Sequence, residues 1–143
     1  SPAFLFAVFL WPSVQHKAEQ LISQRTPIFI AYQHAVSDTL SNQQKHITIP
    51  RRYSAAIREI WDLQHRLTQR RSFMLSRLMR HPRFRAAYDF LLLRAETNEI
   101  LPEIGTWWTC FLEGDDETRK QLTAAVANPP KSAKRPKKRG KTA

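Results

Sequence analysis

The sequence has few of the residues that many-stranded or cross-linked folds require. Its 143 residues include three glycines and one cysteine. No stretch alternates polar and apolar residues with the period of two that marks a half-buried strand, so strands are not expected. Cys110 has no partner for an intrachain disulfide. This favours a reducing compartment, and we expect a cytoplasmic protein.

Motifs of catalysis are also missing. The chain has no Walker loop, no GxGxxG, HExxH or CxxC motif, and no Asp-x-Asp pair. Its five histidines are scattered and none lies at metal-ligand spacing from Cys110, which predicts surface or capping roles for them. The acidic run Asp115-Asp116-Glu117 is typical of a helix start, where negative charge complements the helix dipole. We therefore predict no catalytic residue and no metal ligand in this chain.

Long hydrophobic runs are absent as well. The apolar run from Ala3 to Trp11 is shorter than the roughly 20 residues that a membrane span needs. It also lacks the basic start and the small-residue cleavage site of a signal peptide. We interpret it as a buried core helix and expect no membrane partner. Because the sequence starts at Ser1 and leads directly into this run, we expect it to be a piece of a longer protein.

The sequence does contain apolar stripes with helical spacing, separated by prolines that suit the first turn of a helix. The first helix is expected to end near Trp11 and a second to open at Pro12-Ser13. A third opens at Thr26-Pro27, with a stripe of Phe29, Tyr32, Ala35, Val36 and Leu40. Further helices are expected to open at Ile49-Pro50, Ser72, His81-Pro82, Leu101-Pro102 and Asp115.

Two of these later helices have well-defined stripes. The helix after Pro50 is expected to bury Tyr53, Ile57, Ile60, Trp61, Gln64 and Leu67. The helix after Pro82 is expected to bury Phe84, Ala87, Tyr88, Leu91, Leu92 and Ala95. We predict an all-α fold, an irregular bundle of about six to eight short-to-medium helices followed by a disordered basic C-terminal tail.

Basic residues are abundant, and in the middle of the chain they are all arginine. The net charge is +11. Residues 51–94 contain eleven Arg, no Lys and only three acids, Glu59, Asp62 and Asp89. Guanidinium groups stay charged, bind phosphate through two parallel hydrogen bonds and stack on flat rings. The segment therefore predicts a folded helical module that binds a polyanion.

The spacing of these arginines predicts how they would bind. Arg51, Arg58, Arg66 and Arg70 recur at intervals that suit a ridge along one side of a helix, able to follow a phosphate backbone. Residues 129–143 add seven Lys or Arg and no acid. The predicted RNA-binding residues are Arg51, Arg52, Arg58, Arg66, Arg70, Arg71, Arg77, Arg80, Arg83, Arg85, Lys134, Arg135, Lys137, Lys138 and Arg139.

Internal ion pairing offers a simpler explanation for part of this charge. Arg58 and Asp62, for example, have the i, i+4 spacing of a helical ion pair. Eleven Arg cannot all be neutralised by three acids, so binding is the preferred interpretation. Base stacking is conceivable for Trp61, Trp107 and Trp108. Because they have helical spacing, we prefer to interpret them as core residues.

Several longer segments carry a family resemblance. IPRRYSAAIREIWDLQHRL, HPRFRAAYDFLLLRAE, the following WW pair and the Pro/Lys/Arg tail strongly resemble the C-terminal part of the bacterial poly(A) polymerase I family. SPAFLFAVFLWP is similar to the helix that follows the neck of those enzymes. The resemblance runs in order along nearly the whole chain, although residues 13–48 match less distinctively. The tail is shorter and richer in Lys than the tails typical of the family.

The resemblance implies a polynucleotide adenylyltransferase, which adds AMP from ATP to RNA 3′ ends and thereby promotes RNA decay. The family's catalytic head binds two Mg²⁺ through an Asp-x-Asp pair that this chain lacks. Mg²⁺ and ATP are thus implied for the full-length enzyme, no cofactor is expected in this chain, and the chain alone is expected to be inactive. The implied partners are single-stranded RNA 3′ ends, the catalytic head and neck, and RNA-decay proteins.

On this interpretation the chain has three parts. Residues 1–48 are a helical body segment after the neck, residues 49–127 an Arg-rich RNA-binding arm, and residues 128–143 a disordered Lys/Arg/Pro tail. Two alternatives remain open. One is the body and tail of a tRNA CCA-adding nucleotidyltransferase, although such enzymes generally lack so basic a C-terminus. The other is a stand-alone basic helical adaptor that binds proteins or acidic lipid.

Overall fold

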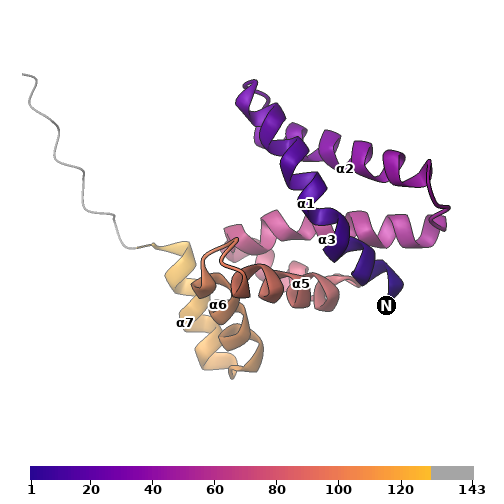
Figure 1. Cartoon of the computed structure of the whole chain (residues 1–143). Coiled ribbons are helices and arrows are strands. Elements are labelled where there is room, and N and C mark those ends of the chain that lie inside the picture. The colour runs from indigo at the N-terminus through magenta and orange to yellow at the C-terminus, as the bar shows by residue number, and fades with distance from the viewer. Residues whose placement is uncertain (130–143) are drawn as a thin grey trace, which may run out of the picture.

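The computed structural model describes residues 1–129, and within that range the chain is helical throughout, with no strand (Figure 1). This confirms the predicted all-α bundle. The helices are α1 (Pro2–Ser23), α2 (Ile28–Gln44), α3 (Arg51–Gln69), the 3₁₀ turn η1 (Ser72–Met74), α4 (Leu75–Met79), α5 (Phe84–Glu96), α6 (Pro102–Glu113) and α7 (Asp116–Ala127). The predicted tail contacts Lys134, Arg135, Lys137, Lys138 and Arg139, and the predicted disorder of the tail beyond residue 129, lie outside the described residues.

The expectation of two helices before residue 24 is wrong, because α1 runs without a break through Pro12. The buried stripe explains this continuity, since it passes Pro12 without losing its helical spacing. Its members are Ala3, Ala7, Trp11, Val14 and Ala18. Pro12 itself is exposed, so its ring meets no neighbouring helix, and packing of the stripe outweighs the lost backbone hydrogen bond.

Prolines mark most of the other helix starts, but often from just outside the helix. Pro27 and Pro50 have extended backbones, with ψ of 141° and 140°, and are the N-caps of α2 and α3. Pro82 precedes α5 by two residues. Only Pro2 and Pro102 stand within a first turn, in α1 and α6. The predicted order of helices is therefore confirmed after α1, with boundaries displaced by one or two residues.

The hairpin of α1 and α2 lies across one side of α3, while α5, α6 and α7 continue on the other side (Figure 1). In α2 the predicted stripe is confirmed from Tyr32 to Leu40, but Phe29 at its start is 67% exposed. The reason is that α2 packs mainly on α1 and makes few contacts with α3. The first turn of α2 therefore has no helix to cover Phe29.

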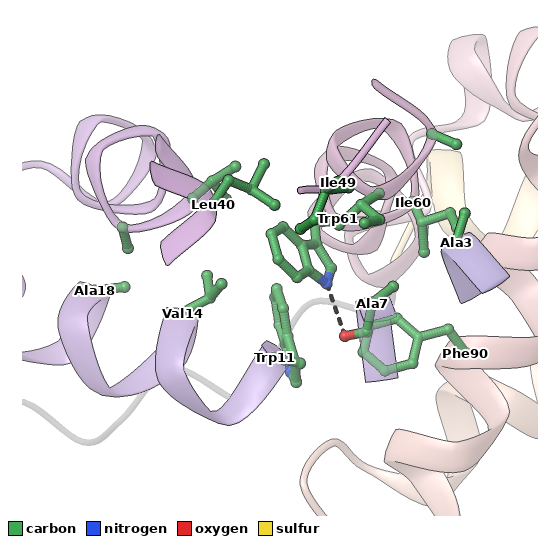
Figure 2. Close-up of a cluster of buried hydrophobic side chains, with 14 residues drawn as sticks. Ala3, Ala7, Trp11, Val14, Ala18, Leu40, Ile49, Ile60, Trp61 and Phe90 are labelled. Carbon is green, nitrogen blue, oxygen red and sulfur yellow. Dashed lines mark hydrogen bonds between the residues drawn. The ribbon is translucent and has the colours of Figure 1, made fainter. Parts of the chain in front are cut away.

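Two clusters of buried side chains form the core. The first joins α1, α2, the first half of α3 and Phe90 of α5. In Figure 2 the rings of Trp11 and Trp61 lie near Phe90, and the Trp61 indole donates a 3.0 Å hydrogen bond to the Ala7 carbonyl. The second cluster joins the end of α3 with α4, α5 and α6, and its centre is the fully buried Trp108.

Helix α3 contributes to both clusters and connects the two halves of the molecule. Ile57 and Trp61 belong to the first cluster, and Leu63 and Leu67 to the second. The first cluster draws residues from both sides of position 48, where the sequence suggested a boundary between body and arm. That division into parts stays a prediction, and in packing terms α3 is shared between them.

Candidate nucleic-acid interface

Three of the predicted contacts form one exposed face of α3. At 100° per residue, Arg51, Arg58 and Arg66 fall within an arc of about 80° around the helix axis. All three are exposed, because the opposite side of α3 carries the buried stripe that serves both core clusters. We call these three residues the arginine face. The neighbouring Arg52 is also exposed but points elsewhere, and its guanidinium stacks on the Tyr53 ring at 4.8 Å.

One acid, Asp62, lies within the arginine face. The ion pair between Arg58 and Asp62 that the simpler explanation offered is not formed; Arg58 donates instead to the Ser37 hydroxyl, at 3.4 Å. Desolvation by the surrounding residues raises the pKa of the Asp62 carboxyl, and nearby Arg66 and Arg58 only partly oppose it. The face thus has no ion pair within residues 1–129, and its one carboxylate has a raised pKa although the residue is exposed.

Arg70 departs from the ridge that the spacing predicted. It ends α3 in the left-handed region, with φ of 49° and ψ of 48°. Its guanidinium lies 5.5 Å from the centre of the Trp107 ring, and its Nε atom is buried without a hydrogen-bond partner. Arg70 therefore helps to close the second core cluster, and contact with RNA stays a prediction for this residue.

The segment after α3 contains three more exposed arginines. Arg71 precedes η1, Arg77 lies in α4 and Arg80 follows α4, and none of the three forms an ion pair within residues 1–129. Together with the arginine face they make six exposed guanidinium groups in residues 51–94 that have neither an ion pair nor a ring contact; Arg52, which stacks on Tyr53, is not among them. These six are the residues that geometry leaves most available for phosphate.

Arg83 and Arg85 are engaged with acids. Arg83 donates to Glu59 of α3 at 3.0 Å, and Arg85 lies 3.5 Å from Asp89 one turn further along α5. Both pairs are largely exposed to solvent, so each contributes little to stability and can exchange for another anion. Their RNA contacts stay predictions as well.

Two structural arginines were not singled out by their spacing. Arg94 is a member of the Arg-rich segment but has only 11% of its side chain exposed, and it donates to Glu99 at 2.8 Å and to Gln64 Oε1 at 3.0 Å. Arg119 of α7 donates to the carbonyls of Phe111 and Leu112 at the end of α6. The structural role of Arg94 could have been predicted from the sequence, because this residue falls beside the buried stripe of α5. The role of Arg119 could not, because its partners depend on the turn between α6 and α7.

The tryptophans behave as predicted for core residues. Trp61 and Trp108 are 3% and 0% exposed, and the Trp108 indole donates to the Leu67 carbonyl at 2.8 Å. Trp107 is only partly buried and stacks on Phe111. The buried indoles have their N–H groups satisfied by backbone carbonyls, so base stacking is not available to them from solvent.

A groove of about 560 Å³ lies between α2 and the second half of α3. We call it the α2–α3 groove. Its lining includes the exposed Phe29, the partly buried Tyr32 and Arg66 of the arginine face. Sequence patterns did not predict it, because the stripe of α2 placed Phe29 in the core. The signal available was the run Ile28-Phe29-Ile30, three successive apolar residues that one side of a helix cannot bury together.

Acidic side chains in residues 1–129 do not gather into a metal site, since no group of three His, Cys, Asp or Glu lies close enough to hold an ion. Asp115 is the N-cap of α7, as the sequence suggested, and accepts a 2.8 Å hydrogen bond from the Thr118 backbone N–H. That bond lowers the pKa of the Asp115 carboxyl. None of the helices in the described range is long and apolar enough to cross a membrane.

Comparison with known proteins adds to this geometry. Residues 24–142 match the family model described as the arginine-rich C-terminus of polymerase A. The chain is 32% identical to the poly(A) polymerase I of Salmonella typhi over 145 aligned residues, which cover 97% of the chain and 31% of that protein. It is 38% identical to the poly(A) polymerase I of Haemophilus influenzae over 125 residues, 85% of the chain and 27% of that protein. The chain thus spans about a third of the length of the curated relatives it matches.

Proposed function

The chain belongs to the family of the polymerase A arginine-rich C-terminus, and from this premise we propose that it is the RNA-holding part of a poly(A) polymerase. The parent enzyme would add AMP from ATP to RNA 3′ ends in the cytoplasm and so direct those RNAs to decay. Within it, this chain would bind single-stranded RNA through phosphate contacts, while a catalytic head in another part of the enzyme performs the transfer.

The observation that supports this proposal is the set of six exposed arginines in residues 51–94 that have neither an ion pair nor an aromatic ring as partner. They are Arg51, Arg58, Arg66, Arg71, Arg77 and Arg80. A guanidinium that is already fixed by a carboxylate must break that pair to bind phosphate, whereas these six need not. Their density over α3 and α4 suits a flexible, sequence-independent strand of phosphates more than a single small anion.

Mg²⁺ and ATP would be supplied elsewhere in such an enzyme. The residues of this chain do not fit a two-metal centre, since the described residues hold no cluster of three potential ligands and Asp115 is already engaged at a helix N-terminus. We assign no step of the reaction to this chain and propose that its contribution is the position and retention of the RNA.

Contact with the rest of the enzyme would involve the outer side of α1. Leu5 and Phe9 are 56% and 76% exposed there, one helical turn apart. Two large apolar side chains in register on a helix are typical of a surface that another domain covers. Since the relatives are about three times as long as this chain, we propose that their additional domains, the head and neck, pack on this side.

The test replaces Arg58, Arg66 and Arg71 with Ala in the 143-residue chain. Binding of a fluorescein-labelled oligoadenylate is measured by anisotropy across a salt series, without ATP or Mg²⁺. Each phosphate contact to a single strand contributes about 0.7 to the slope of log K against log salt, so the triple variant should lose about 2 from that slope. Its affinity should fall at least about tenfold at low salt.

A matched control removes the same charge elsewhere. Lys17, Lys45 and Lys120 lie on α1, at the end of α2 and on α7, outside α3 and α4, and their replacement by Ala also lowers the net charge by three. This control should change the salt slope much less than the arginine triple variant. Equal losses from both variants would mean that binding depends on net charge alone, and an unchanged slope in a folded arginine variant would refute the proposed interface.

A further inference from the structure

The α2–α3 groove exists because of the way the α1–α2 hairpin sits on α3. Helix α2 is held mainly by α1, so its first turns stand away from the second half of α3 (Figure 1). The space between them, about 560 Å³, is lined by residues of both helices together with Trp11 of α1 and Arg94 of α5. This is the size range of pockets that bind a single nucleotide-sized ligand.

Two stacked rings, from α1 and α2, are among the residues that line the groove. Trp11 and Tyr32 are stacked with centroids 6.0 Å apart and an angle of 24° between their planes. Arg94 lies 4.9 Å from the centre of the Trp11 ring, held in place by Glu99 and Gln64. Trp11 is only 5% exposed, so the partly buried Tyr32 is the ring of this pair that a ligand can reach, and the polar groups of Arg94 already have partners.

The α2 side of the groove carries an exposed aromatic ring, and the α3 side carries a cation. Phe29 is 67% exposed although it lines the groove, so one face of its ring is open to a ligand. Across the groove stands Arg66, which has no ion pair in the described residues. Arg66 also borders a second recess of about 170 Å³ that contains Arg71 and the 75% exposed Phe73. Aromatic and basic groups thus alternate along this surface.

We propose that the α2–α3 groove receives one unpaired base of single-stranded RNA, stacked against Phe29, while the adjoining phosphate rests on Arg66. This inference depends on the proposed RNA-holding function and adds a base contact to it. Alternating rings and cations suit a ligand that alternates bases and phosphates, because stacking on aromatic side chains does not depend on base identity. A purely apolar peptide segment would leave Arg66 without an anionic partner.

The test compares Phe29→Ala with Phe9→Ala, a control in which the phenylalanine on the outer side of α1 is also largely exposed. Each variant is titrated with an oligoadenylate and with an abasic oligomer that has the same number of phosphates. Loss of one stacked base should weaken oligoadenylate binding about tenfold in the Phe29 variant. Binding of the abasic oligomer should stay unchanged, as should both affinities of the Phe9 variant.

The indole N–H signals in NMR spectra give a second readout. Oligoadenylate should shift the Trp11 and Trp61 signals, which belong to groove-lining residues, and leave the Trp108 signal in the second core cluster unmoved. The abasic oligomer should leave all three in place. Shifts of the Trp11 and Trp61 signals of equal size with both oligomers would overturn the base contact.

The outcomes separate this inference from the proposed function. If Phe29→Ala leaves both affinities unchanged while the arginine triple variant lowers both, the groove proposal fails and the RNA-holding function stands. If neither the arginine variant nor the Phe29 variant affects either oligomer, both fail. If Phe29→Ala lowers only the self-association of the chain in sedimentation experiments, the occupant of the groove is a second copy, and the base contact is refuted.

Discussion

Two arginines near the second half of α3 lie over tryptophans, and the two pairs are built differently. On the side of the α2–α3 groove, which we call the groove end, Arg94 lies over Trp11 and donates hydrogen bonds to Glu99 and Gln64. Where α3 ends, which we call the sealed end, Arg70 lies over Trp107 with its Nε buried and unpartnered and its backbone in the left-handed region. The first arginine is fully engaged by polar partners, and the second is retained mainly by a ring contact.

The difference shows that local arginine density does not identify which arginines belong to the fold. Glu99 accepts hydrogen bonds from Trp11 and Arg94 through the same carboxylate oxygen, so it connects α1 to the turn after α5. Arg70 has no acid of this kind beside it in the described residues. We therefore expect the two ends to respond unequally when their arginines are removed.

The largest effect is expected for Arg94→Ala. The substitution leaves the Glu99 carboxylate without its cation and the buried Gln64 side-chain carbonyl without a donor. Breaking a partly buried pair of this type should lower the free energy of unfolding by about 2 kcal/mol in urea denaturation. Arg70→Ala, which loses one partly exposed ring contact, should cost about 0.5–1 kcal/mol.

Arg85→Ala is the control for Arg94→Ala, because Arg85 has an ion pair that is mostly exposed. Its effect should stay below about 0.5 kcal/mol. If Arg94→Ala costs no more than this control, the Glu99 connection does not stabilise the fold and the proposed inequality between the two ends is lost.

A smaller effect is expected from relief of backbone strain. Arg25 and Arg70 have φ of 67° and 49°, a region that side chains with a Cβ atom adopt at a cost. Arg25→Gly, at an exposed turn, should raise the free energy of unfolding by up to about 1 kcal/mol. Arg70→Gly gains the same relief but loses the contact with Trp107, so its net change should be about zero.

The difference between the changes in the free energy of unfolding of Arg25→Gly and Arg70→Gly measures the contact between Arg70 and Trp107 at the sealed end of α3. The same urea denaturation experiment serves both. Equal stabilisation by the two substitutions would show that Arg70 gains nothing from Trp107, and the comparison between the ends would then rest on Arg94 alone.

The fold was predictable wherever burial repeats with helical spacing. The stripes of α3 and α5 were predicted almost residue by residue, because each of these helices packs on neighbours along its whole length. The break at Pro12 was wrong, since a local rule about proline was outweighed by a buried stripe that continues past it. The prediction that Phe29 belongs to the core was also wrong. Its spacing fits the stripe of α2, but no helix covers the start of α2.

The candidate site was predictable in composition and less so in detail. Charge counting identified a segment with more arginines than its acids can pair, and seven of those arginines, Arg52 included, are indeed exposed without ion pairs in residues 1–129. The sequence did not reveal that Arg83 reaches Glu59 on a different helix, or that the chain turns at Arg70. Both depend on how α3 and α5 lie relative to each other, which no local pattern records.

The smallest effect is expected from two aspartates whose pKa values move in opposite directions. At the groove end, desolvation raises the pKa of Asp62, so the folded chain binds its proton more tightly than the unfolded chain. The free energy of unfolding therefore falls as pH rises from the ordinary value of 3.8 through the raised folded value. In α7, beyond the sealed end, the hydrogen bond from Thr118 lowers the pKa of Asp115, so its contribution is present above the ordinary value and is lost as pH falls through the lowered one.

Asp62→Asn should abolish the first of these dependences. Relative to the unmodified chain, the variant should gain more stability at pH 7 than at pH 3.5, whereas Asp115→Asn should lose more at pH 7 than at pH 3.5. Urea denaturation at the two pH values measures both differences. Because the Asp62→Asn substitution also removes the one carboxylate within the arginine face, oligoadenylate should bind this variant more tightly than the unmodified chain at pH 7, where the carboxylate is charged. Parallel pH profiles for the two variants would mean that folding does not raise the pKa of Asp62.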